Sequence, residues 1–184
     1  MGMCDRMNVL SKVVMVGAVG ITLAAAAFTG VALAAGEDEP TGSNGGSIVE
    51  DYTYPGAAGI LASYKVELIA GDGHIVWADC STPPTGDIGL IKVYTTELIG
   101  QNDEGLICFR ALGPVGRLDL KVPAVFEIRG DGITRGTGHN GTATVTTEAG
   151  VKTTKGLDPD GSTQFGIGEG GEEPTTLLQL TVAP

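Results

Sequence analysis

The sequence has few of the residues on which catalysis most often depends. Its 184 residues include two histidines, three cysteines and only 5% aromatic residues. Nucleophilic catalysis needs a base within hydrogen-bond reach of a serine, threonine or cysteine, but His74 and His139 each follow a glycine in an apparent turn or loop. The G-x-S-x-G motif of many hydrolases is also missing. We therefore expect both histidines to be exposed turn residues and the protein not to be an enzyme.

Motifs for metals and cofactors are missing as well. Structural zinc sites use closely spaced cysteine or histidine pairs, and the sequence has none. Residues 158–161 begin like a calcium-binding loop, but Thr163 stands at the sixth position, where an EF-hand needs glycine. No phosphate-binding loop or dinucleotide fingerprint is present. We expect no cofactor and no metal.

Basic residues are outnumbered two to one by acidic residues. The chain has 11 Lys and Arg against 22 Asp and Glu, which gives a formal net charge of −11. This balance argues against binding to nucleic acid or to an anionic membrane surface through charge. It suits a soluble exported protein, or a protein with a basic partner.

Residues 1–34 have the pattern of a secretory signal peptide. Arg6 and Lys12 precede an apolar run over residues 13–33, and Ala32-Leu33-Ala34 matches the small-x-small cleavage pattern. The alternative is a retained membrane span, which requires about 20 apolar residues. We favour the signal peptide. The protein is then secreted and extracellular, with no membrane contact after cleavage.

Two cysteines, Cys80 and Cys108, follow the signal peptide. In an oxidising compartment, two cysteines in one small domain most simply form one disulfide. The alternative is a pair of free buried thiols. We expect the disulfide.

Residues 35–54 are expected to form a flexible, acidic N-terminal extension. Residues 36–46 are acidic, rich in glycine and free of large apolar side chains, a composition typical of disordered segments. The rest of the extension is different, because apolar and aromatic side chains return at Ile48, Val49, Tyr52 and Tyr54. This part is either the first edge strand of the domain or a peptide that orders on a partner, by adding a strand or filling a cleft.

Residues 55–184 predict a single β-domain. Residues 64–68 alternate apolar and charged side chains, which is the period of a half-buried strand. Gly71-Asp72-Gly73 has turn chemistry, and residues 74–80 have the composition of a second strand. We expect these two strands to pair as a hairpin.

Further strands are predicted at short intervals, without a convincing helical period. Pro123 ends one strand, bends it or lies at an edge. Eight or nine short strands with Gly and Pro between them predict an all-β fold, a single β-sandwich of the immunoglobulin or transthyretin type. The remaining expected strands are residues 89–95, 106–112, 117–122, 124–129, 142–148, 151–155 and 177–182.

The alternation of side chains along the second expected strand, residues 74–80, determines which face carries Trp77, the only tryptophan. Alternation places Ile75 and Trp77 on one face and Cys80 on the other. We expect Trp77 to face the core and the disulfide to lie on the opposite side of the sheet or at the strand ends. If the cysteines face the core instead, Trp77 is exposed and is a candidate interface anchor.

Four segments carry a resemblance to a known family. They are YPGAAGILASYKVELIAGDGHIVWADC at residues 54–80, ICFR at residues 107–110, LKVPAVFEIRGDG at residues 120–132 and PTTLLQL at residues 174–180. Together they resemble small secreted proteins of Streptomyces and related actinobacteria, the UmbB adaptor subunits of umbrella toxin particles. The resemblance covers residues 54–184 and rests on overall pattern.

The resemblance implies a non-enzymatic adaptor of a multi-subunit antibacterial toxin. Such an adaptor connects a trypsin-like, lectin-bearing subunit to a large ring-and-stalk subunit that carries the toxin domain. Its N-terminal extension enters the cleft of the trypsin-like partner, which makes Ile48, Val49, Tyr52 and Tyr54 the expected partner-binding residues. The alternatives are a freestanding module that binds cell wall or carbohydrate, or a secreted protease inhibitor.

Overall fold

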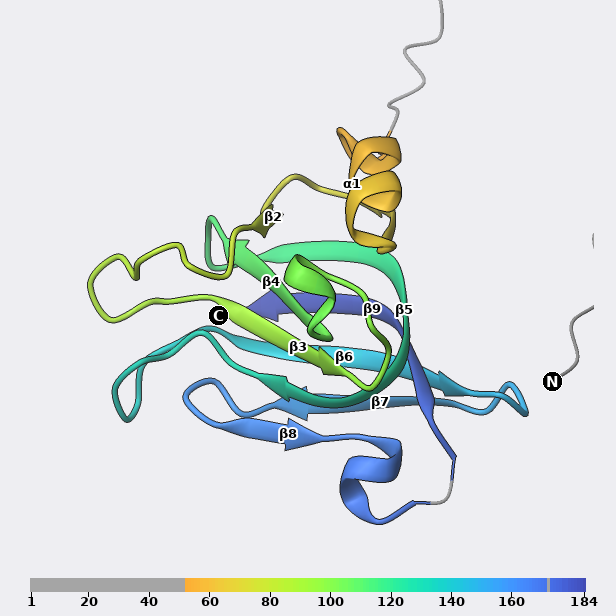
Figure 1. Ribbon diagram of the computed structural model, residues 1–184. Coiled ribbons are helices and arrows are strands. Elements are labelled where there is room, and N and C mark those ends of the chain that lie inside the picture. The colour runs from red at the N-terminus through yellow and green to blue at the C-terminus, as the bar shows by residue number, and fades with distance from the viewer. Residues whose placement is uncertain (1–51, 172) are drawn as a thin grey trace, which may run out of the picture. The chain divides into compact units, whose positions relative to one another are not determined.

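The computed structural model of the chain describes residues 52–171 and 173–184 (Figure 1). The expected signal peptide and most of the expected extension, including Ile48 and Val49, lie outside the described residues. Within the described ranges, nine strands form one antiparallel sheet, accompanied by one α-helix and two short 3-10 helices. In chain order the elements are α1 (Ala57–Tyr64), β1 (Glu67–Gly71), β2 (Ile75–Ala78), β3 (Ile91–Thr95), η1 (Gln101–Asp103), β4 (Leu106–Ala111), β5 (Gly116–Arg129), β6 (Asn140–Thr147), β7 (Lys152–Leu157), β8 (Ser162–Gln164), η2 (Gly166–Glu169) and β9 (Thr175–Ala183).

The sheet folds into a sandwich through its longest strand, β5. The first half of β5 pairs with β1 on one side and β9 on the other, whereas its second half pairs with β3 and β8. One layer therefore contains β2, β4, β3, the second half of β5 and β8. The other contains β1, the first half of β5, β9, β6 and β7. Figure 1 shows β5 running across the top of the domain, turning at the right and returning below. The expected all-β, sandwich-like fold is confirmed.

The turn in β5 lies at Pro123 and Ala124. Pro123 cannot donate a ladder hydrogen bond, and Ala124 has a φ of 51°. The pairing of β5 with β9 shifts register on both sides of Val122, as expected where a strand changes layer through a bulge or bend. The hydroxyl of Thr95 donates to the carbonyl of Pro123 at 2.6 Å. Of the three roles predicted for Pro123, the structure has the bend.

The core lies between the two layers. Alternate residues of β5 (Leu118, Leu120 and Val122) are fully buried, and Phe109 and Phe165 are the largest fully buried side chains. Burial of such apolar surface is the main favourable contribution to folding. Among the described residues, no helix is long and apolar enough to cross a membrane.

The expected hairpin of β1 and β2 is wrong. β1 pairs with β5, whereas β2 pairs with β4, so the two strands lie in different layers. The bend between them is present, because a carboxylate oxygen of Asp72 accepts a hydrogen bond from the backbone N–H of His74 at 3.0 Å. Turn chemistry predicts where a chain changes direction, but a strand's partner depends on which long-range contacts bury its apolar face.

Helix α1 was not predicted from the sequence. It has eight residues and begins after Gly56, which has a φ of 75°. Lys65 caps its C-terminal end, where the backbone N–H of Lys65 donates to the carbonyl oxygen of Leu61. Its core-facing residues (Ala57, Ile60 and Tyr64) have helical spacing, but the helix is apolar on nearly every side, so no period stands out. The strand expected from residue 64 consequently begins at Glu67.

The other strand predictions are confirmed with small shifts of their ends. β3, β4 and β9 match the expected segments, and β6 and β7 pair as the expected hairpin. The segments expected on the two sides of Pro123 form the single strand β5. Cys80 and Cys108 are joined with an S–S distance of 2.12 Å.

Candidate functional site

Tyr54 lies near the start of the described residues and anchors this segment to the fold. Its side chain is only 8% exposed and belongs to the core. The hydroxyl accepts a hydrogen bond from the backbone N–H of Trp77 at 2.6 Å. The Trp77 ring lies 4.8 Å from the ring of Tyr64 and 6.1 Å from that of Phe109. Trp77 therefore faces the core, as predicted.

Residues 52–54 add a short strand to the outer edge of β1. The backbone N–H of Tyr54 donates to Ile69 at 3.1 Å, and that of Gly71 donates to Tyr52 at 3.0 Å. A bridge between Thr53 and Ala70 lies between these bonds. For these three residues the structure corresponds to the edge-strand interpretation. The described fold thus includes three residues of the segment that we assigned to the extension.

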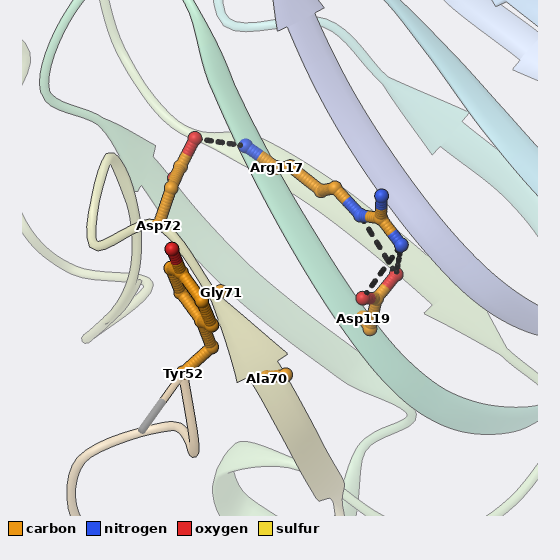
Figure 2. A pocket seen from close by; sticks show the side chains of 6 residues that line it. All are labelled: Tyr52, Ala70, Gly71, Asp72, Arg117 and Asp119. Atoms are coloured by element: carbon orange, nitrogen blue, oxygen red, sulfur yellow. Dashed lines mark hydrogen bonds and ion pairs between the residues drawn. The ribbon is translucent and has the colours of Figure 1, made fainter. Parts of the chain in front are cut away.

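Tyr52, unlike Tyr54, points outward. Its side chain is 58% exposed and borders a hollow of about 370 Å³. Figure 2 shows the ring beside Gly71, with Asp72 on one side and the pair Arg117 and Asp119 across the hollow. We call this the Tyr52 hollow, lined by Tyr52, Ala70, Gly71, Asp72, Arg117 and Asp119.

The polar side chains of the Tyr52 hollow are held in place by hydrogen bonds. Asp72 accepts from the backbone N–H of Arg117 at 2.9 Å, and His74 Nδ1 lies 3.5 Å from its carboxylate. Burial alone would raise the pKa of Asp72, but hydrogen bonds from the His74 and Arg117 backbones outweigh it and lower the pKa below its ordinary value of 3.8. The guanidinium of Arg117 contacts both carboxylate oxygens of Asp119.

The chemistry of the Tyr52 hollow suits recognition. An exposed aromatic ring supplies contact area, and the ion pair of Arg117 and Asp119 supplies oriented charges of both signs. Gly71 allows the close approach of β1 and β5, because a Cβ at this position would lie 3.1 Å from the carbonyl oxygen of Arg117. His74, with its side chain 57% exposed, is the exposed residue that the sequence predicted.

The expectation of an exposed His139 is wrong. Its side chain is 21% exposed, and Nδ1 lies 2.7 Å from the carboxylate of Asp131, which is 1% exposed. The same carboxylate accepts from the backbone N–H of His139 at 2.8 Å. A buried carboxylate needs such partners, because burial of an unpaired charge is costly.

Asp131 and His139 lie where two loops are joined. The backbone N–H of Gly89 donates to the carbonyl of Asp131 at 2.6 Å, and that of Ile133 donates to Asp87 at 3.1 Å. The connection between β5 and β6 thus holds the long connection between β2 and β3. Loops at one end of a sandwich commonly carry binding residues.

Neither a protein-family model nor a curated protein sequence matches the chain. The function therefore has to be argued from the site itself and from the resemblance stated above. Sequence reasoning selected Tyr52 and Tyr54, but it missed Arg117 and Asp131. Their partners, Asp72 and His139, lie 45 and 8 residues away, and no short motif indicates such a pairing.

Proposed function

We propose that the protein is a secreted, non-enzymatic adaptor subunit of a multi-subunit antibacterial toxin particle. Its N-terminal extension inserts into a trypsin-like, lectin-bearing partner, and its β-domain binds the large toxin subunit. The particle and the identity of both partners come from the resemblance to umbrella toxin adaptors. The manner of attachment comes from the geometry around Tyr52 and Tyr54.

The observation that carries the proposal is the contrast between these two tyrosines. Tyr54 is buried and hydrogen-bonded to β2, which anchors the end of the extension to the core. Tyr52, two residues earlier, is exposed beside a hollow with charged walls. Because Tyr54 is anchored in the core, the neighbouring exposed ring of Tyr52 is held at the domain surface. A partner that binds this ring is thereby attached to the domain. Tyrosine is also enriched among the residues that dominate interface energies.

A deletion of residues 36–51 tests this proposal. The tagged secreted protein is used to recover partners from culture supernatant, and the partners are identified by mass spectrometry. The deletion must stop before Tyr52, because removal of Tyr54 would leave the Trp77 N–H without its acceptor. We expect the full protein to recover a trypsin-like lectin and the deleted protein to lose it.

The matched control is the folded state of the deleted protein. Its thermal unfolding midpoint should equal that of the full protein, since residues 52–54 keep their bonds to β1. Equal recovery of the same partner by both proteins would show that the extension is not the tether. Recovery of no partner by either protein would contradict the adaptor function.

A further inference from the structure

A second hollow, of about 400 Å³, lies between the connection of β2 with β3 and the end of β4. Its lining combines one cation, one imidazole and an apolar wall, and no aspartate or glutamate is among the described residues that line it. We call it the Arg110 hollow. The residues that matter here are Arg110, His139, Ile88, Ala111, Leu112 and Pro114.

Arg110 has no carboxylate partner within the described part of the chain. Its guanidinium donates to the carbonyl of Pro83 at 2.9 Å and reaches the hydroxyl of Thr85 at 3.5 Å. By contrast, Arg117 has both oxygens of Asp119. The bonds of Arg110 to neutral oxygens orient the guanidinium without neutralising its charge. Because a guanidinium has five N–H donors, others remain for an anion.

Among the described residues, the ring of His139 is hydrogen-bonded through Nδ1 alone. Nδ1 contacts the buried carboxylate of Asp131, which fixes the ring and turns Nε2 to the opposite side. His139 also lines the Arg110 hollow. A neutral imidazole that donates from Nδ1 offers a lone pair at Nε2, whereas an imidazolium donates from both nitrogens. A carboxylate can accept a hydrogen bond from Nε2 when the imidazole carries a proton there.

The remaining wall of the hollow is apolar. Leu112 is 59% exposed, and it lies beside Ala111 and Pro114 in the lining. Its backbone N–H donates to His74 at 2.8 Å, which holds the rim in place. Apolar walls with a few placed polar groups are typical of small-ligand sites.

We propose that the Arg110 hollow binds a carboxylate carried by a short apolar group, with Arg110 and His139 on the carboxylate and Leu112 against the apolar group. This chemistry is found at the C-terminus of a peptide that ends in an aliphatic residue and in a free aliphatic acid. The site does not depend on the adaptor function, because none of its residues belongs to the N-terminal segment.

An NMR titration of the protein, with its disulfide formed, tests the proposal. The probes are an acetylated tripeptide ending in leucine, the same peptide with an amidated C-terminus, and isovalerate. We expect saturable shifts of the Leu112, Gly113 and His139 amides with a probe that carries a carboxylate. The amidated peptide should cause none. Saturation with isovalerate identifies a small acid as a sufficient ligand, and saturation with the peptide alone identifies a peptide terminus.

Three variants locate the binding. Arg110→Gln should weaken it at least about tenfold, since a charge-assisted hydrogen bond is lost. Leu112→Ala should weaken it as well, because the apolar group of the ligand loses its contact while the Arg110 side chain is kept. Lys152→Gln, with the same change in net charge as Arg110→Gln at an exposed site on β7, should bind like the unmodified protein.

Three results would overturn the proposal, the first two of which concern the probes. One is the absence of saturable shifts up to millimolar concentrations of every probe. The other is equal binding of the free and amidated peptides, which would show that the carboxylate is not recognised. A loss of binding in Lys152→Gln as large as that in Arg110→Gln would likewise assign the effect to overall charge and contradict the site.

Discussion

The hydroxyl of Tyr54 ties the N-terminal segment to β2, in addition to the backbone bonds of that segment to β1. Tyr54→Phe removes the acceptor of the Trp77 N–H and keeps the ring. We expect a loss of about 1–2 kcal/mol in the free energy of unfolding, because a half-buried N–H loses its partner. Denaturant unfolding followed by Trp77 fluorescence measures it. The control is Tyr94→Phe, since the Tyr94 ring contacts Phe126 and its hydroxyl has no hydrogen bond among the described residues.

The lowered pKa of Asp72 predicts how the free energy of unfolding changes in acid. Because hydrogen bonds lower its pKa in the folded protein below 3.8, the unfolded state binds a proton more readily than the folded state. The stabilisation is therefore present above pH 3.8 and is lost as the pH falls through the lower, folded-state pKa.

Asp72→Asn measures that contribution. The variant should be less stable at neutral pH by no more than about 1 kcal/mol, because solvent screens the group. The difference should shrink below pH 3.8 in denaturant titrations. Glu148→Gln, at an exposed position in the β6–β7 turn, changes the charge equally and should show no such trend. A difference for Asp72→Asn that is independent of pH would assign its effect to packing instead.

Among the elements and their connections, the contact between the β2–β3 and β5–β6 connections depends on glycine at position 132. A Cβ at Gly132 would collide with the carbonyl oxygens of Thr137 and Pro159, whereas a Cβ at Gly113 would meet nothing within 4 Å. Gly132→Ala should therefore cost about 1–3 kcal/mol in unfolding free energy, as overpacking does, and Gly113→Ala should be nearly neutral. Thermal unfolding of both variants checks this. Equal midpoints would show that the junction adapts to a side chain.

The elements also show which local patterns are informative. Residues 117–122, an expected strand, alternate charged and apolar side chains. The three apolar ones, Leu118, Leu120 and Val122, are fully buried. The class of fold followed from such runs and the glycines between them. Strand partners did not follow, because β1 and β2 are neighbours in sequence but bury their apolar faces in different layers.

The candidate sites could be predicted only in part. The aromatic residues near the start of the domain stand out in an acidic segment, so Tyr52 and Tyr54 were selected. The sequence did not predict that Tyr54 is buried and Tyr52 exposed, because Tyr54 lies over the core and Tyr52 at its edge. Arg110 lies on β4, whereas His139 and its partner Asp131 lie on the connection between β5 and β6. No local spacing indicates that Arg110 and His139 line one hollow.

For the molecule as a whole, the disulfide lowers the conformational entropy of the unfolded chain. Cys80 and Cys108 are separated by 28 residues, and Cys108 is fully buried outside the core cluster that contains Phe109. The double variant Cys80→Ala, Cys108→Ala should lose about 3.6 kcal/mol of unfolding free energy in the chain-entropy model. Denaturant unfolding compares it with the oxidised protein. Equal free energies would contradict this role of the bridge.

If the N-terminal extension tethers the domain to a partner, the extension alone should carry the binding to an unrelated protein. Residues 36–54 are fused to an unrelated carrier protein, and the fusion is used to recover partners from culture supernatant. We predict that the fusion recovers the same trypsin-like lectin as the full protein. A version with alanine at Ile48, Val49 and Tyr52 should not. If the fusion recovers nothing while the full protein still binds the lectin, the contact is made by the β-domain, and the claim is contradicted.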